Sequence, residues 1–305
     1  MGGPSAEHDV SIASGKMVCE NLNKDRYEVI PVHVTRGGEW ALSFENLMDS
    51  ADIVFLALHG EYGEDGTVQQ FLDGIGLPYT GSSARASALG MNKVASSKLF
   101  KANGLDVPDW IEVTRNDEWA RLRSPFGYPV VIKPVDRGSS VGVSIVRNEF
   151  GIQEALCNVF EISRNAMVEQ YVSGREITCA VLEDERGNIP LPPTEIFPLG
   201  AEFFDYNAKY QTGGSKEITP APITSRETEI VQQIAVAAHE IIGASGVSRT
   251  DMIIGNDGRI YVLEINTLPG LTPTSLLPQA ANQMGLSHSA LLDKIIASAI
   301  RKSRR

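Results

Sequence analysis

Residues 249–266 read RTDMIIGNDGRIYVLEIN, and this stretch decides the fold that we predict. Two apolar runs flank a Gly-Asn-Asp-Gly turn, which is the pattern of an antiparallel β-hairpin. Asp251 and Glu264 then lie on neighbouring strands, and Asn266 points to the same face as Glu264 because side chains alternate along a strand. Hard oxygen donors that converge in this way are the ligands that Mg²⁺ prefers, and two buried carboxylates without a cation would be costly. The hairpin therefore predicts a metal site, with an exposed polar hairpin as the alternative.

A second predicted hairpin lies upstream at 129–146, where two apolar strands flank the sequence KPVDRGSSVG. Lys133 closes the first strand, and backbone N–H groups of the Gly/Ser turn can surround phosphate oxygens. The lysine supplies a positive charge to the same anion. The Walker A pattern GxxxxGK[ST] does not occur in the chain, which argues against a P-loop fold. A phosphate-binding hairpin and an ordinary turn are both compatible with these residues.

Around the two hairpins the pattern continues as an α+β arrangement. Apolar periodicity predicts helices at 91–103, 150–161, 225–242 and 287–300, and strands at 166–172, 176–183 and 189–196. Ser225 is expected to cap the helix at 225–242. The segment 198–222 has no apolar period and is rich in Gly, Thr and Pro. A loop of that length inside a domain is usually functional or disordered.

The first 90 residues have the alternating pattern of a doubly wound α/β unit. Short apolar strands are predicted at 27–34, 53–58 and 77–80, with helices at 11–22 and 67–72. Ligands bind such sheets at the carboxyl ends of the strands. The loops GGPSAE at 2–7 and HGEYGEDG at 59–66 are therefore candidate binding loops, with a purely structural role for His59 as the alternative.

The sequence LPGLTPTS at 268–275 follows the predicted metal site directly. Gly270 permits a close backbone approach, so its N–H can serve a developing oxyanion. Ser275 is a candidate for binding a substrate carboxylate. A Pro/Gly connector without chemistry is the alternative, and it would be preferred if this segment stood alone.

The composition of the chain argues against several classes of protein. The chain has 305 residues, which at roughly 150 residues per domain suggests about two domains. Its net charge of −11 argues against a general nucleic-acid surface, which needs a clustered basic face. No apolar run approaches the roughly 18 residues of a membrane span, and the first residues show no secretory signal pattern. Three widely spaced cysteines indicate reduced thiols, as in a cytoplasmic protein.

Taken in order, seven motifs resemble those of the D-alanine–D-alanine ligase family of ATP-grasp enzymes: GGPSAEHDVS, HGEYGEDG, VIKPVDRGSSVGV, EQYVSGREIT, DYNAKY, GVSRTDM and LEINTLPGLTPTSLLP. The resemblance covers nearly the whole chain. It implies an α/β and α+β protein with a doubly wound parallel-sheet domain at 1–90, followed by a two-subdomain ATP-grasp fold. The central subdomain would span 91–174, and the carboxyl-terminal subdomain would span 175–305 with a lid loop at about 199–218.

The resemblance also implies a nucleotide site. The residues that match the family's ATP-binding positions are Lys93, Lys133, Ser140, Glu169, Gln170, Val172, Glu176 and Lys209. Asp251, Glu264 and Asn266 match the ligands of two Mg²⁺ ions, for which Mn²⁺ is a substitute.

The reaction that the resemblance implies joins two D-alanines through an acyl phosphate, for peptidoglycan precursor synthesis. Substrate binding falls to Glu7, His59, Lys209 and Ser275, and the oxyanion site to Arg249 and Gly270. Ser139 and Tyr210 match partners of Glu7 in a hydrogen-bonded triad. Tyr210 stands where depsipeptide-forming relatives typically carry histidine, so D-alanine is expected over D-lactate as the second substrate. A homodimer is expected as well.

Two alternatives and one departure remain. Another ATP-grasp ligase would keep Lys133, Glu169 and the metal ligands but need different residues at Glu7, Tyr210 and Ser275. A nucleotide-binding sensor without catalysis would lack Arg249 or a metal ligand. The departure is that family members usually carry a short apolar strand before the GG loop, whereas this chain starts Met1-Gly2-Gly3. We expect an open slot in the amino-terminal sheet, a weaker seat for Glu7, and either a misassigned start or a trimmed chain.

Overall fold

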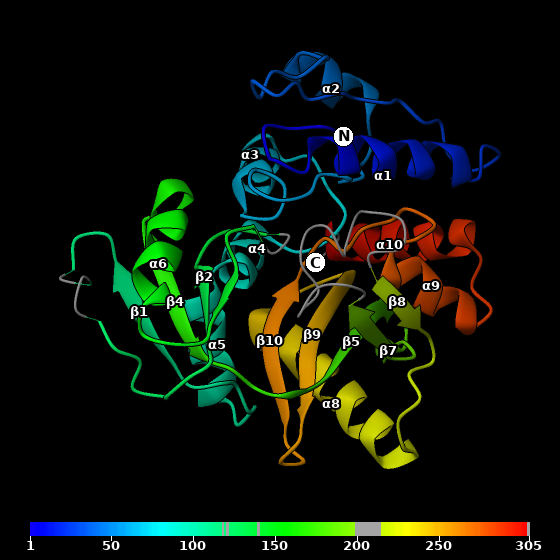
Figure 1. Ribbon diagram of the computed structural model, residues 1–305. Coiled ribbons are helices and arrows are strands. Elements are labelled where there is room, and N and C mark those ends of the chain that lie inside the picture. Colours follow the sequence, from blue (N-terminus) through cyan, green and yellow to red (C-terminus); the bar gives the residue numbers. More distant parts are fainter. Residues whose placement is uncertain (118, 120–121, 139–140, 199–214, 304–305) are drawn as a thin grey trace.

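The computed structural model describes residues 1–117, 119, 122–138, 141–198 and 215–303. Two antiparallel sheets stand side by side beneath an amino-terminal region that forms the top of the molecule in Figure 1. Ser139, Ser140, Lys209, Tyr210 and most of the expected lid lie outside the described residues. No helix within the described ranges is both long and apolar enough to cross a membrane.

The larger sheet has six strands in the order β10-β9-β5-β7-β8, with β6 paired to β5. Their bounds are β5 Gly174–Asp184, β6 Gly187–Pro190, β7 Thr194–Pro198, β8 Ser215–Ile218, β9 Val247–Gly255 and β10 Ile260–Asn266. All of these pairs are antiparallel. The predicted hairpin of 249–266 is therefore confirmed as β9 and β10. Strand β8 lies in the segment 198–222, where we expected only a loop.

The smaller sheet has four strands in the order β1-β4-β2-β3, all antiparallel. Their bounds are β1 Trp110–Thr114, β2 Val130–Pro134, β3 Ser144–Val146 and β4 Asn165–Gln170. The predicted hairpin of 129–146 is confirmed as β2 and β3. This sheet and the larger one flank the site described below.

The helices are α1 His8–Asn21, α2 Phe44–Ser50, α3 Thr67–Ile75, α4 Ala84–Met91, α5 Lys93–Ala102, α6 Gly151–Ile162, α8 Ser225–Ile242, α9 Leu276–Gln283 and α10 His288–Ser303. Helices α2 and α9 are absent from the sequence-based prediction. The single helix expected at 91–103 is preceded by α4, and Asn92 caps α5 by accepting the Ala95 N–H. The cap of α8 is Thr224 rather than Ser225, because Thr224 and Glu227 form a capping box.

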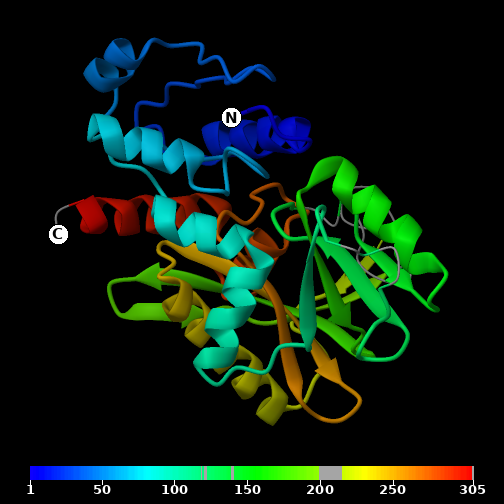
Figure 2. The same cartoon turned by 90° about the vertical axis from the view of Figure 1, so that its left-hand side faces the viewer.

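Alternation along β5 explains how the larger sheet is covered on both faces. Ile177, Cys179 and Val181 pack in one cluster with α8, whereas Ala180 and Leu182 pack in another with α9 and α10. Helix α6 covers one face of the smaller sheet. The opposite face of the smaller sheet lines a cavity. Figure 2 shows the two sheets turned by 90° from the view of Figure 1.

The amino-terminal region has the expected parallel arrangement, but its segments pair only at single bridges. Gly2 bridges both Val34 and Leu58, and Val54 bridges Tyr79, all in parallel. The apolar segments at 27–34 and 53–58 thus run side by side without forming regular strands. Their separation follows from the slot between them.

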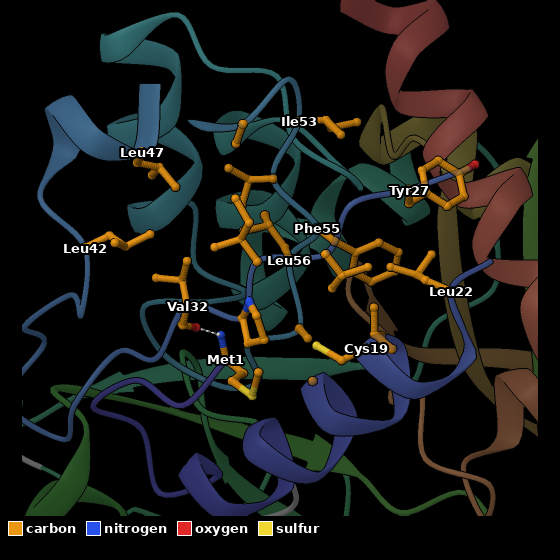
Figure 3. Close-up of a pocket in the computed structure, with 18 of the residues that line it drawn as sticks. Met1, Cys19, Leu22, Tyr27, Val32, Leu42, Leu47, Ile53, Phe55 and Leu56 are labelled. Carbon is orange, nitrogen blue, oxygen red and sulfur yellow. Dashed lines mark hydrogen bonds between the residues drawn. The ribbon is translucent and has the colours of Figure 1, made fainter. Parts of the chain in front are cut away.

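The expected slot is present as a cavity of about 160 Å³ between residues 27–34 and 53–58 (Figure 3). Met1 closes one end, where its amino group donates to the Val32 carbonyl at 2.9 Å. Burial lowers the pKa of this amino terminus to about 6. Because Gly2 already bridges to both neighbours, a chain running back from Met1 would enter the slot in line with them.

Candidate active site

Two adjoining cavities contain the predicted site residues that the structure describes. The first, of about 410 Å³, is lined by Glu7, His59, Lys93, Arg249, Glu264, Asn266, Gly270 and Ser275, among others. The second, of about 120 Å³, is lined by Lys93, Lys133, Glu169, Gln170, Val172, Glu176, Asp251 and Glu264, among others. Lys93 and Glu264 line both cavities, so the two spaces meet at this pair. We call them the amino-acid cavity and the nucleotide cavity.

The carboxylates of the β9–β10 hairpin lie opposite each other, as predicted. Asp251 pairs with Glu264 in the ladder, next to a register shift between Val262 and Glu264. Arg249 donates from Nε and Nη2 to the two oxygens of Asp251, each at 2.8 Å, and Thr178 donates to Oδ1 at 2.7 Å. Bidentate Arg–carboxylate pairing of this kind fixes the orientation of both groups.

The third predicted oxygen donor is the Asn266 amide, whose Oδ1 accepts the Leu268 N–H at 2.9 Å. Glu264 lies 3.1 Å from Lys93 Nζ. In the described part of the chain, no three His, Cys, Asp or Glu side chains group as a metal cluster. A cation here would therefore depend on two carboxylates and one amide. The set of hard oxygens, now balanced by Arg249 and Lys93, fits Mg²⁺.

A buried ion pair stands at the inner end of the nucleotide cavity. Lys133 Nζ donates to Glu169 Oε2 at 2.8 Å, and the two side chains are 7% and 3% exposed. Burial raises the pKa of Glu169, although the charge of Lys133 opposes the rise. Glu169 Oε1 is buried without a hydrogen-bond partner within the described ranges. A buried acceptor without a donor is costly, which suits it to an N–H donor on a ligand.

Glu7 and His59 both line the amino-acid cavity. Glu7 is 6% exposed, and a Cβ built on Gly60 would lie 2.8 Å from Glu7 Oε2. Any larger residue at position 60 would therefore displace the carboxylate. His59 contacts Ser14 Oγ through Nε2 at 2.8 Å and Glu64 Oε1 through Nδ1 at 3.5 Å. Burial raises the pKa of Glu64.

Gly270 and Ser275 lie together at the mouth of the amino-acid cavity. A Cβ on Gly270 would stand 2.7 Å from Ser275 Oγ, so a side chain at position 270 would displace this hydroxyl. Ser275 Oγ contacts Thr272 through its Oγ1 at 2.8 Å and accepts the Thr272 N–H at 3.1 Å. Ser275 precedes α9 but makes no side-chain cap to it. Its hydroxyl is thus directed into the loop that borders the cavity.

Several lining residues have no counterpart in the sequence-based prediction. In the nucleotide cavity they are the apolar side chains Val131, Ile145, Ile253 and Leu263, and in the amino-acid cavity they are Met91, Glu217, Thr272 and Thr274. The apolar group could have been predicted from the sequence. Val131 and Lys133 are two residues apart on β2 and so point to the same face, and Lys133 was already expected to bind phosphate. Glu217 carried no signal, because β8 was expected to be a loop.

Comparisons with known proteins identify the family of the chain. Residues 99–297 match the family described as "D-ala D-ala ligase C-terminus", and residues 1–49 and 42–82 match "D-ala D-ala ligase N-terminus". The D-alanine–D-alanine ligase of Syntrophobacter fumaroxidans is 43% identical over 307 residues, which cover 98% of this chain and 96% of that protein. That of Leptospira interrogans (serovar Lai) is 38% identical over 343 residues, covering 99% and 97%.

Solved structures give the same result for the fold. The VanG D-Ala:D-Ser ligase from Enterococcus faecalis superposes with a TM-score of 0.87 at 33% identity, covering 98% of this chain and 97% of that one. The Bacillus anthracis D-alanine–D-alanine ligase complexed with ATP gives a TM-score of 0.83 at 35% identity, covering 100% and 97%. The α/β and α+β architecture is that of ATP-grasp ligases, and the chain belongs to the D-alanine–D-alanine ligase family.

Proposed function

We propose that this chain is an ATP-dependent ligase that joins two D-alanines into D-alanyl-D-alanine for peptidoglycan precursor synthesis. The observation that carries the proposal is the meeting of the amino-acid cavity and the nucleotide cavity at Lys93 and Glu264. A γ-phosphate and a substrate carboxylate can approach each other only where such cavities adjoin. Phosphoryl transfer mainly requires this positioning together with neutralisation of charge.

The nucleotide would lie between the two sheets. Glu169 Oε1, which has no hydrogen-bond partner among the described residues, would accept the exocyclic amine of adenine, and Gln170 and Val172 line the same cavity. Glu176 stands where the family binds ribose. Lys93 and Lys133 would contact phosphates, and we extend this role to Ser140 and Lys209 from the resemblance alone.

The reaction would proceed in two steps. The carboxylate of the first D-alanine attacks the γ-phosphorus of ATP, which forms an acyl phosphate and releases ADP. The amine of the second D-alanine attacks the acyl carbon and loses a proton, and the C–O bond to phosphate breaks to release inorganic phosphate. Arg249 and the N–H of Gly270 are placed at the amino-acid cavity to stabilise the oxyanion of the second step.

Asp251, Glu264 and Asn266 would hold two Mg²⁺ ions, or Mn²⁺ in their place. When bound, these cations would neutralise charge on the phosphates. In their absence Arg249 and Lys93 hold the carboxylates in place, which keeps the ligand oxygens on the side of the nucleotide cavity. The protein therefore supplies a preformed set of ligands.

The amino acids would be held at opposite ends of the larger cavity. Glu7, with His59 beside it, is placed to bind the ammonium of the first D-alanine, and Ser275 the carboxylate of the second. We propose that Ser139 and Tyr210 complete a triad with Glu7, that Lys209 contacts the second substrate, and that residues 199–218 form a lid. These four roles rest on the family motifs.

An ADP-release assay tests the proposed function. The chain should release ADP with ATP, Mg²⁺ and D-alanine, and should not do so without D-alanine or Mg²⁺. Glu264→Gln should lower kcat by about 10²-fold or more, because it removes a charged ligand of the cations that would neutralise the transferring phosphate. Full activity of that variant would contradict the assigned metal site. Parallel reactions with D-serine and D-lactate test the second substrate, and equal or better use of D-lactate would contradict the role given to Tyr210.

Two further expectations concern the state of the protein. We propose a homodimer, which multi-angle light scattering tests directly. We also propose a cytoplasmic location, supported by three cysteines that are all free thiols and by the need for ATP.

A further inference from the structure

A short segment of the chain separates the two cavities at the top of β2. Arg137 lines the nucleotide cavity, and the next residue, Gly138, lines the amino-acid cavity. A Cβ built on Gly138 would stand 3.2 Å from Glu7 Oε2 and 3.9 Å from the Cα of Gly60. The segment therefore touches the amino-terminal region at backbone distance, directly beside the carboxylate that we assign to the first substrate.

An ion pair spans this contact. Arg137 Nε lies 3.0 Å from Glu61 Oε1, and the two side chains are 30% and 34% exposed. Glu61 is the residue next to Gly60, and Arg137 is the residue next to Gly138. The ion pair therefore joins the direct neighbours of the two glycines that approach Glu7. The guanidinium also donates to the Ile162 carbonyl, and Lys93 Nζ donates to the Arg137 carbonyl at 2.6 Å. Arg137 is thus anchored to the central part of the chain while its charge reaches the amino-terminal region.

We propose that Arg137 and Glu61 are positioning residues that form an electrostatic latch. The latch holds the segment of Arg137 and Gly138 against Gly60 and Glu7, and so closes the amino-acid cavity around the first substrate. This proposal rests on the proposed function, because it assigns the closed end of the cavity to D-alanine. Without the latch, the approach of Gly138 to Glu7 and Gly60 would remain among the described residues.

The latch should affect substrate binding more than the stability of the fold. Partly exposed ion pairs contribute little to the stability of a folded chain. Here, however, the ion pair sets the distance between the segment of Arg137 and Gly138 and the amino-terminal region, and both must contact the first D-alanine. Binding is sensitive to a change in that distance. The KM for the first D-alanine should therefore rise when either partner is removed, while the melting temperature changes little. Because Arg137 also lines the nucleotide cavity and Glu61 does not, the KM for ATP should stay unchanged on removal of the Glu61 charge.

A double-mutant cycle tests the latch. Glu61→Gln and Arg137→Gln should each raise the KM, and the calorimetric Kd, for the first D-alanine about five-fold, the factor expected when a favourable ion pair is lost. The double variant should be no worse than Arg137→Gln alone, because each substitution breaks the same contact. Raising the ionic strength should weaken D-alanine binding by the wild-type chain more than by the double variant.

The chain offers a matched control. Arg26 and Asp293 form an ion pair of 2.6 Å that also joins the amino-terminal region to the rest of the chain, and neither residue lines the two cavities. Arg26→Gln should leave the KM for D-alanine unchanged.

Four results would overturn the latch: an unchanged KM and Kd in Glu61→Gln, additive effects in the double variant, an equal effect of Arg26→Gln, or a matching loss of ATP affinity and melting temperature in Glu61→Gln. If the wild-type chain binds D-alanine but releases no ADP, the proposed function fails while the calorimetric cycle still decides the latch. If it does not bind D-alanine at all, both fail.

Discussion

At the scale of single residues, Glu169 shows how burial and charge compete inside the nucleotide cavity. Desolvation disfavours its carboxylate, and the single contact with Lys133 Nζ at 2.8 Å opposes that effect. Glu169→Gln removes the charge that balances Lys133 and places an amide donor in the cavity. We expect ATP affinity to fall by about 10-fold or more, because breaking one side of a buried pair leaves the other uncompensated. Calorimetric titration with ATP measures this.

Glu161→Gln is a suitable control for that prediction, because Glu161 is an exposed residue of α6. Its ATP affinity should equal that of the unaltered chain. Unchanged affinity in Glu169→Gln would contradict the adenine site assigned here.

The buried amino terminus gives a prediction about pH. Burial lowers its pKa from 8.0 to about 6, so between these values the unfolded chain binds a proton that the folded chain does not. The free energy of unfolding should therefore fall by about 2–3 kcal/mol as the pH is lowered from 8 to 6. Denaturant titrations at several pH values measure the slope, and a chain acetylated at Met1 should lack this contribution. Equal slopes would show that the amine is not desolvated.

At the scale of elements, α8 shows what local sequence can and cannot determine. The helix spans Ser225–Ile242 as predicted, because its apolar period is strong. Its cap was wrongly predicted, since Thr224 and Ser225 are both good capping residues, and only the backbone decides which one is extended. Thr224 has φ −67° and ψ 156°, and its side chain accepts the Glu227 N–H.

The cap can be tested by two neighbouring substitutions. Thr224→Ala should lower the free energy of unfolding by about 1 kcal/mol, the usual value of an N-cap side chain. Ser225→Ala should be close to neutral. Thermal unfolding of the two variants side by side measures the difference, and the reverse order would restore Ser225 as the cap.

Elements whose formation depends on distant partners were harder to predict. Both hairpins were predicted because period-two alternation and turn residues are local signals. Strand β8 was not predicted, because it forms by pairing with β7 and its own four residues carry no strand pattern. The segments at 27–34 and 53–58 have strand-like sequences, yet the slot between them leaves them paired at single bridges. Likewise Asp251, Glu264 and Asn266 were predictable from one hairpin, whereas Glu217 was not.

At the scale of the whole molecule, the slot predicts a gain in stability on extension of the chain. When six apolar residues are placed before Met1, those nearest to it should enter the cavity of about 160 Å³ in a direction parallel to both neighbours. A cavity of this volume has room for about one or two apolar side chains, whose burial should add roughly 2 kcal/mol and raise the melting temperature by several degrees. The KM for the first D-alanine should fall too, because Glu7 lies a few residues downstream.

The control is a Gly/Ser extension of the same length, which offers little apolar surface to bury. Differential scanning fluorimetry and the ADP-release assay would compare the two extended chains with the present one. If both extensions behave alike, the slot does not accept a strand.

The wall shared by the two cavities has a consequence for inhibitor design. Among the described residues, Lys93 and Glu264 are the two that line both cavities, and a contact of 3.1 Å joins them. A single two-headed molecule, with a purine mimic at one end and an amino-acid mimic at the other, would need only a short anionic linker to pass this point. The anionic linker would take the place of the Glu264 carboxylate beside Lys93. The molecule would thereby join two weak ligands into one strong one.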